Sequence, residues 1–543
     1  MTIRSLSHFR RTNTAVVLGV ATAVAVLAGA LIVGDSVRGS LRDLASRRLG
    51  RTDFIISSTA SFFREGLAED FFSQPDFGKR FESACPMIVV QGFVTGPDNR
   101  RASGVQVYGV DDRFWRFHRR PAGTADGAGF SAALGRELGI KEGDSILITV
   151  QKPSAIPLES LHGRKDEVAR SIRLTASRLL AESDLGEFSL RPQQGAVFAV
   201  FIPLSRLQKD LDRPGRVNTL LISSLASQPT ADQDPVAVLD SLLLARCRLE
   251  DFGLKVRVLP KQGCIVLESD SAIISDAVAS AATYAAGHPL ASHLRVRLTA
   301  APVLTYLANT IRSAGREVPY SLITAVDQVT FGRLQREEGK NRQAPSADGG
   351  PPILLNEWAA SDLQAKPGDQ IEIEYYVWKD EGRLVTDKSR FRLDDVVRID
   401  GAAADRDFVP EYPGITESES LSDWNPPFPM DLGRVRKVDE DYWHRYRTTP
   451  KAFVLLEDGQ RLWGSRFGSL TSIRLIPPAG SELRSASDLQ RIADDYENDL
   501  RDMLDPRSLG IAAYPVRADS LEASHGATDF GEYFLYFSFF LVV

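Results

Sequence analysis

The chain has 543 residues, of which 65 are basic and 71 are acidic, so its formal net charge is −6 at pH 7. A chain of this length is too long for one ordinary hydrophobic core, and two or more subdomains are expected. The near balance of charge excludes the strongly basic face that nucleic-acid binding requires, so no nucleic-acid partner is expected.

An uncharged segment near the N-terminus is the strongest signal in the chain. No charged residue occurs between Arg11 and Asp35, and residues 15–33 are almost entirely apolar. Because a bilayer core about 30 Å thick requires roughly 20 apolar residues in a helix, this segment is long enough to cross a membrane. We predict a cytoplasmic N-terminus over residues 1–13 and a transmembrane helix over residues 14–34.

A cleaved signal peptide is the alternative interpretation of this segment. Arg4, Arg10 and Arg11 precede it, and the Ala-Gly-Ala sequence at 28–30 resembles a signal-peptidase site. The apolar run is nevertheless long for such a peptide. Basic residues flank the run on both sides and do not fix its orientation, but long domains are translocated largely regardless of charge. We therefore expect the chain in the inner (cytoplasmic) membrane with its large domain extracytoplasmic.

The residues that follow the predicted span read as a helix and then as strands. Val37, Leu41 and Leu44 recur at helical spacing, which predicts that the helix continues over residues 36–49 and stops at Gly50. The next predicted elements are strands over residues 53–57, 87–94 and 104–110, with a turn over residues 96–99 between the last two.

Two segments far apart in the chain share one pattern, L-x-x-K-x-G-D-x-I-x-I. They are residues 138–148 and residues 363–373, and they match without a gap. The pattern predicts a short helix, a Lys-x-Gly-Asp turn and a strand that points alternate isoleucines inward. Further strands are predicted near residues 171–176 and 391–399. This echo indicates either two halves of one β-rich module or chance reuse of a common turn.

The segment between the two copies alternates strands and helices. The predicted strands cover residues 196–202, 217–223, 254–259 and 264–268, and the last two form a hairpin around residues 260–263. The predicted helices cover residues 204–211, 235–251 and 271–286. Such alternation predicts helices layered on a sheet. The polar, breaker-rich segment 336–352 is expected to be a mobile loop or a subdomain boundary. An amphipathic helix over residues 488–504 indicates surface packing in preference to a docking face.

The three cysteines show no metal-binding spacing. Cys85, Cys247 and Cys264 are far apart in the sequence, and none forms a C-x-x-C motif. Cys247 and Cys264 form a disulfide if the helix that carries the first packs on the strand that carries the second. The alternative is that all three are small buried hydrophobic residues.

The motifs of common catalytic and binding sites are missing from the sequence. His288 and His293 have neither helical i, i+4 spacing nor a nearby third ligand, and Gly339-Lys340 lacks the upstream glycine of a phosphate-binding loop. Residues 268–271 lack the glycine and the distal glutamate of a calcium loop. We predict no catalytic, cofactor-binding or metal site, no cofactor and no enzymatic activity.

Two further segments have simple structural interpretations. The acidic run of residues 439–441 reads as a solvated surface. Residues 423–429 combine tryptophan and three prolines, which predicts a stiff, extended aromatic strap over the module in preference to a ligand groove.

A second apolar run lies at the end of the chain, over residues 533–543. Eleven residues are too few to span a bilayer as a helix. We therefore expect an extracytoplasmic domain over residues 35–530, with a possible internal boundary near 336–352, and a truncated second transmembrane helix over residues 531–543. The chain is then a fragment or a truncated gene product.

An ordered series of short segments resembles FtsX-like ABC transporter permeases, the group that includes macrolide-exporter and lipoprotein-release permeases. The series covers nearly the whole chain, although no single member is diagnostic. It comprises residues 34–41, 152–157, 188–192, 215–218, 304–309, 319–321, 449–453, 462–468 and 526–530.

This resemblance implies an α+β architecture. It consists of an N-terminal transmembrane helix, a large extracytoplasmic (periplasmic-core-like) domain of two α/β subdomains, and the start of a second transmembrane helix. It also implies a separate ATP-binding subunit, contact with membrane lipid, and a dimer or pseudo-dimer with further permease segments.

The mechanism that the resemblance implies is mechanotransmission, in which ATP binding by the partner moves the membrane helices and the motion reaches the outer domain. The helix over residues 36–49 is expected to act as a stiff lever. The helix over residues 488–504 and the segment to Phe530 are expected to form the returning arm. A membrane-anchored extracytoplasmic binding or scaffold protein without an ATPase partner is the main alternative, and an anchored hydrolase is a third.

Overall fold

The computed structural model describes most of the chain, and the account below concerns these residues. They are residues 9–58, 61–121, 127–151, 169–225, 234–289, 296–336, 350–379, 383–411, 415–416, 418–424, 429–479 and 485–524. The predicted second span at 531–543 lies outside them, as do residues 425–428 of the predicted strap and residues 337–349 of the predicted loop.

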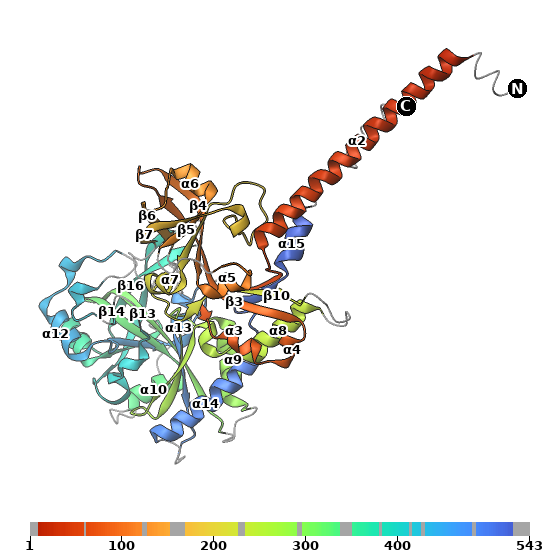
Figure 1. The fold of residues 1–543 in the computed structure, drawn as a ribbon. Helices are drawn as coiled ribbons and strands as arrows, with labels where there is room; N and C mark the ends of the chain where they lie inside the picture. Colours follow the sequence, from red (N-terminus) through yellow and green to blue (C-terminus); the bar gives the residue numbers. More distant parts are fainter. Residues whose placement is uncertain are drawn as a thin grey trace.

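A single long helix, α2 (Arg10–Leu49), projects from a β-rich body (Figure 1). Among the described residues it is the one helix long and apolar enough to cross a membrane, with a mean hydropathy of 2.7 over an apolar window that is 0% buried. It runs without a break from the apolar segment to the body, so the predicted continuation over residues 36–49 is confirmed. Gly50 caps its C-terminus, as predicted.

The first half of the body is built on a nine-stranded sheet. Six of its strands close into a small barrel, because β3 pairs with β6 as well as with β4. In sheet order the strands are β20 (Ile511–Tyr514), β1 (Phe54–Ser58), β10 (Thr219–Ser224), β3 (Phe81–Thr95), β4 (Arg101–Val110), β8 (Ala199–Pro203), β5 (Ala128–Ser131), β7 (Ala169–Leu180) and β6 (Ser145–Gln151).

The second half is built on another nine-stranded sheet, whose barrel closes through a pairing of β13 with β16. In sheet order the strands are β11 (Leu254–Leu259), β12 (Cys264–Ser269), β19 (Ser472–Ile476), β13 (Thr299–Ser313), β14 (Arg316–Val326), β18 (Ala452–Leu455), β15 (Pro352–Asn356), β17 (Arg383–Val397) and β16 (Gln370–Lys379).

The two sheets have the same topology, strand by strand. Counted from the β20 and β11 edges, the fifth and sixth strands are parallel in both sheets, as are the seventh and eighth, and every other neighbouring pair is antiparallel. Both sheets also carry a register shift at the same parallel pair, β5–β7 and β15–β17. The structural repeat that the sequence echo indicated is therefore confirmed.

The turn at the centre of the echo is the same in both halves. The Lys141 amide donates to the Asp144 carboxylate over 2.8 Å, and the Lys366 amide donates to the Asp369 carboxylate over 2.8 Å. This hydrogen bond closes the Lys-x-Gly-Asp turn and directs the following strand into the barrel. The strands β6 and β16 then point alternate isoleucines into the core, as the period of two predicts.

Short helices cover the sheets. The first half has α3 (Leu67–Phe72), α4 (Pro75–Gly78), α5 (Asp112–Phe117), α6 (Ala132–Leu138), α7 (Leu204–Asp210) and α8 (Pro235–Arg246). The second half has α9 (Asp276–Gly287), α10 (Gln328–Arg336), α11 (Glu357–Leu363), α12 (Lys437–Tyr446), α13 (Leu456–Trp463) and α14 (Ala486–Met503), and α15 (Val516–Ala523) follows β20. A two-stranded sheet joins β2 (Phe63–Arg64) to β9 (Arg216–Val217).

The two halves exchange an edge strand. The chain leaves α8 of the first half, passes through a 3-10 turn (Leu249–Phe252) and adds β11 to the second sheet. It leaves α14 of the second half and adds β20 to the first sheet. The helix α8 packs on β20, and α14 packs on β11. Each half is therefore completed by a strand that follows the last helix of the other.

The amphipathic helix predicted over residues 488–504 packs into the second core, so packing is confirmed as its role. Leu489, Ile492, Tyr496 and Leu500 are buried against β11, β12 and α9. In Figure 1, α14 lies on the side of the body away from α2. Of the expected returning arm, α15 and not α14 packs against α2.

Several local expectations require correction. The helix predicted over 235–251 ends at Arg246. The acidic run at 439–441 is solvated only in part, because Asp441 is exposed but Asp439 is 0% exposed and its carboxylate caps the start of α12. The three cysteines are free and buried, so the disulfide alternative is wrong.

The structure describes only part of the predicted strap and of the segment near 336–352. Trp424 is buried edge-on against Trp443, with ring centroids 4.9 Å apart, as expected of a cover over the sheet. The helix α10, which precedes the segment, packs on β17 and β18, and β15, which follows it, belongs to the same sheet.

Candidate functional site: the junction between the apolar helix and the body

The end of α2 is fixed by a close contact beneath Gly50. This glycine has φ of +56°, in the left-handed region that favours glycine. A Cβ at Gly50 would lie 2.5 Å from His118 Nδ1, so no other residue fits there without displacement of the imidazole. The helix therefore ends at a defined residue and the chain turns directly into β1.

Arg48, in the last turn of α2, binds the helix to the loop that precedes β8. Its guanidinium is only 6% exposed and pairs with Glu187 at 2.7 Å. It also donates to the Gln193 carbonyl over 2.5 Å and to the Gly195 carbonyl over 2.8 Å. An arginine buried with this many acceptors fixes both the position and the rotation of the helix end.

His118 forms the floor of the junction. Its ring is buried among Phe114, Phe117 and Phe188, with centroids 4.7, 4.9 and 5.4 Å away, and its Nδ1 accepts from the Arg51 amide over 3.2 Å. Burial, and to a smaller extent nearby arginines, lower the pKa of His118 to about 3. The imidazole is therefore neutral, and its other nitrogen, Nε2, is buried without a hydrogen-bond partner.

The C-terminal part of the described chain meets the end of α2. Arg517 of α15 pairs with Asp53 at 2.5 Å and donates to the Gly50 carbonyl over 2.5 Å. Asp53 also accepts from the Ser224 amide over 2.7 Å. One carboxylate thus joins the exit of α2, the strand β10 and the helix α15, although Arg517 is 464 positions away in the chain.

A shallow groove of about 180 Å³ runs between α2 and α15. Its walls come from both helices and from the loop bound by Arg48. The lining includes Leu41, Leu44, Arg191, Pro192, Ser520 and Ala523. Figure 1 shows α15 beside the base of α2.

The end of α2 is bound to the first half at two points. Arg48 binds it to the loop before β8, and Asp53 and Arg517 bind it to β1 and α15. Since β20 follows α14 directly, the second half is connected to the same point. Among the described residues, no group of three or more His, Cys, Asp or Glu side chains could hold a metal ion.

The residues that the sequence raised for chemistry are dispersed. His288 stacks on Tyr284 with ring centroids 4.2 Å apart, and Glu268 is buried in a pair with Arg257 at 2.8 Å. His293 and Gly339-Lys340 lie outside the described residues. The junction residues Arg48, His118 and Arg517 were not singled out by the sequence. The one available signal was the arginine pair in the last helical turn, which fits the helix dipole equally well.

Comparison with solved structures gives weak likenesses, two of which follow. No protein-family model matches the chain, and no curated protein matches its sequence. The periplasmic region of MacB from Actinobacillus actinomycetemcomitans matches with 9% identity and a TM-score of 0.22, over 36% of this chain and 83% of that one.

A domain of a putative permease protein from Porphyromonas gingivalis matches with 12% identity and a TM-score of 0.22, over 38% of this chain and 85% of that one. Both TM-scores are too low to assign a fold or a family.

Proposed function

We propose that this chain is a permease subunit of an FtsX-like ABC transporter, or part of one, that acts by mechanotransmission and has no catalytic activity of its own. In this proposal α2 crosses the inner membrane and the body is extracytoplasmic. A separate ATP-binding subunit supplies the movement, and further permease segments complete a dimer or pseudo-dimer.

One observation carries the proposal. The helix that is apolar enough to cross a membrane continues without interruption into the body. Its end is fixed by the buried Arg48 and by Gly50, which lies against His118. A helix that served only as a tether needs no such fixation, because a flexible linker would hold the body equally well at the membrane. A continuous helix is stiff and carries both displacement and rotation.

The test uses the complete transporter, purified with its ATP-binding subunit. Amide hydrogen exchange is compared with and without a non-hydrolysable ATP analogue. We expect the analogue to change exchange in the loop 187–195 and in β20. Arg42→Pro breaks the helix between the membrane and the junction and should abolish this change, whereas Arg42→Ala should preserve it. If the ATP analogue still changes hydrogen exchange in Arg42→Pro, α2 does not act as a lever.

The main alternative is an anchored binding or scaffold protein without an ATPase partner. The cavity described in the next subsection favours a binding role. Co-purification separates the two functions: capture of a P-loop ATPase subunit with the tagged chain supports the permease, and its repeated absence under mild detergent supports the anchored binding protein.

A further inference from the structure

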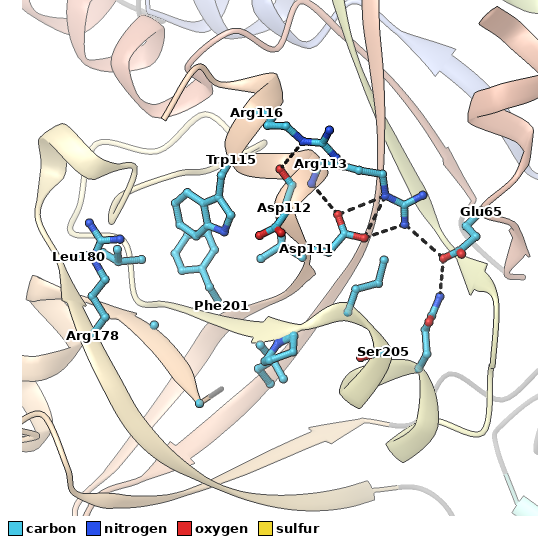
Figure 2. A pocket seen from close by; sticks show the side chains of 17 residues that line it. Glu65, Asp111, Asp112, Arg113, Trp115, Arg116, Arg178, Leu180, Phe201 and Ser205 are labelled. Atoms are coloured by element: carbon cyan, nitrogen blue, oxygen red, sulfur yellow. Dashed lines mark hydrogen bonds and ion pairs between the residues drawn. The ribbon is translucent and has the colours of Figure 1, made fainter. Parts of the chain in front are cut away.

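A cavity of about 550 Å³ opens in the first half, between α5, α7 and the barrel strands β5, β7 and β8 (Figure 2). This volume falls in the usual range of small-molecule sites. Trp115 and Phe201 form an aromatic wall, with ring centroids 5.9 Å apart. Gly129, Leu180 and Arg178 line the same space.

The structural repeat provides an internal comparison for this cavity. In the first barrel, Gly129 lies opposite Phe201 and follows the register shift of β5 against β7. In the second barrel, Leu354 lies opposite Phe453 and follows the equivalent shift of β15 against β17. Gly129 therefore occupies the position of Leu354.

The equivalent positions of the second half carry a leucine where the first half has Gly129. Five cavity positions have counterparts that pack together in one buried cluster. The pairs are Val110 and Val326, Trp115 and Phe331, Gly129 and Leu354, Leu180 and Val397, and Phe201 and Phe453. Among these five pairs, Gly129 and Leu354 are the one pair whose side chain is smaller in the first half, whereas Trp115 and Leu180 are larger than Phe331 and Val397. A leucine at Gly129 would begin 3.1 Å from Leu180 Cδ1 and extend among the groups that line the cavity.

The charge also differs between the two halves. By the same register, Arg178 occupies the position of Asp395. The nearest carboxylate to Arg178 is that of Asp184, at 3.8 Å, which is the long limit of an ion pair. The first half therefore combines added space with an added, weakly compensated cation.

The remaining polar groups divide between the two sides of the cavity. Figure 2 shows Arg178 on one side of the aromatic wall and the Asp111–Arg113–Glu65 network on the other. Arg113 holds Asp111 at 2.7 Å and Glu65 at 3.5 Å, so these acids are already paired. In Figure 2 no hydrogen bond joins the indole N–H of Trp115 to another residue that is drawn.

We propose that this cavity binds a small organic anion. Its flat apolar body lies against Trp115 and Phe201, and its acid group lies at Arg178. The apolar wall provides burial, the arginine provides a charge-assisted hydrogen bond, and the indole N–H provides a further donor. The exposed carboxylate of Asp112 at the rim disfavours a second acid group on the ligand. This site does not depend on an ATPase partner.

The test measures binding of naphthalene-2-carboxylate to the full chain in lipid nanodiscs by isothermal titration calorimetry, with empty nanodiscs as the blank. We expect saturable one-to-one binding with a dissociation constant of about 1 mM or tighter. Naphthalen-2-ylmethylammonium, which has the same body and the opposite charge, should bind at least about tenfold more weakly. Absence of saturable binding, or equal binding of the two probes, would overturn the proposal.

Two variants localise the site. Gly129→Leu introduces the leucine that the second half has at this position. It should abolish binding of the carboxylate, while the thermal midpoint of unfolding stays within a few degrees. Arg178→Gln should weaken carboxylate binding about tenfold or more, whereas Arg173→Gln, an exposed arginine on the same strand, should not. If Gly129→Leu does not fold, the comparison of Arg178→Gln with Arg173→Gln tests the site. Unchanged binding in Arg178→Gln refutes the site.

Discussion

His118 is a buried, neutral histidine at the point where α2 meets the body. Because its pKa is lowered to about 3 in the folded chain, the unfolded chain binds a proton at a higher pH than the folded chain does. Stability attributable to His118 is therefore complete above its ordinary pKa of 6.5 and is lost as the pH falls toward 3.

We predict that acidification from pH 7 to pH 5 lowers the free energy of unfolding by about 2 kcal/mol through this residue alone. His118→Gln keeps an acceptor for the Arg51 amide but does not titrate, so its stability should depend less on pH over the same range. Denaturant unfolding at the two pH values measures the difference. If the unfolding free energy changes equally with pH in the two proteins, protonation of His118 does not destabilise the fold.

Lys451 is a buried basic residue in the second half. Its ammonium group is buried, 4.9 Å from the ring centroids of both Trp358 and Tyr442. Burial lowers the pKa of Lys451 to about 8 from its ordinary 10.5. Between these two values the unfolded chain holds more protons than the folded chain, so stability increases with pH across that window.

Lys451→Met removes this titration while it preserves most of the side-chain volume. From pH 7 to pH 9.5 the unmodified protein should gain about 2 kcal/mol of unfolding free energy relative to the variant. The comparison of two denaturation midpoints at each pH isolates the lysine from other groups. A constant difference between the proteins would mean that water reaches the ammonium group.

At the scale of elements, α2 depends on its last turn. Arg48→Gln leaves Glu187 and two carbonyl groups without their guanidinium donor, and we expect a loss of about 2–3 kcal/mol of local stability. Hydrogen exchange in the loop 187–195 should accelerate accordingly. Arg47→Gln is the matched control, because Arg47 is 61% exposed and its pair with Glu182 contributes little. Similar exchange in the two variants would contradict the anchoring role.

Most elements were predictable from the sequence because their signals are local. The continuation of α2, the twin Lys-x-Gly-Asp turns and the face of α14 each follow from spacing or turn chemistry. Within the acidic run, Asp439 was misread because its capping role depends on Arg436 and on the start of α12. Charge alone does not distinguish a cap from a solvated surface.

At the scale of the whole molecule, the pairing of β20 with β1 was not predictable. β20 is a strand of four residues, and its residues do not specify which sheet it joins. The junction between α2 and the body was not predictable from the sequence for a similar reason. Asp53 and Arg517 meet only because β20 pairs with β1. Contacts between distant segments are set by tertiary packing, which local patterns do not encode.

The exchange predicts that the two sheets share their stability. Leu500→Ala in α14 creates a cavity in the second core and should cost about 2–5 kcal/mol. Because β20 follows α14, hydrogen exchange should accelerate in β1 of the first sheet as well as in β12 of the second. Leu244→Ala, at a half-exposed position of α8, is the control. Faster exchange confined to the second sheet would show that the halves unfold independently.

Ion pairs hold both segments in which the chain passes from one half to the other, between α8 and β11 and between α14 and β20. Arg64 holds the fully buried Asp251 at 2.9 Å beside the first crossing, and Arg507 holds Asp240 of α8 at 2.5 Å beside the second. Each pair joins a crossing segment to the first half. The crossings are therefore fixed parts of the body and not loose linkers.

A solitary half of this molecule would display an open sheet edge at β1 or at β12, and its last helix would have no strand to rest on. Two identical solitary halves would satisfy one another by trading those strands around a two-fold axis. The present chain has the connectivity of such a swapped pair joined end to end, so cleavage between β11 and β12 should yield two pieces that recover structure only when they are mixed.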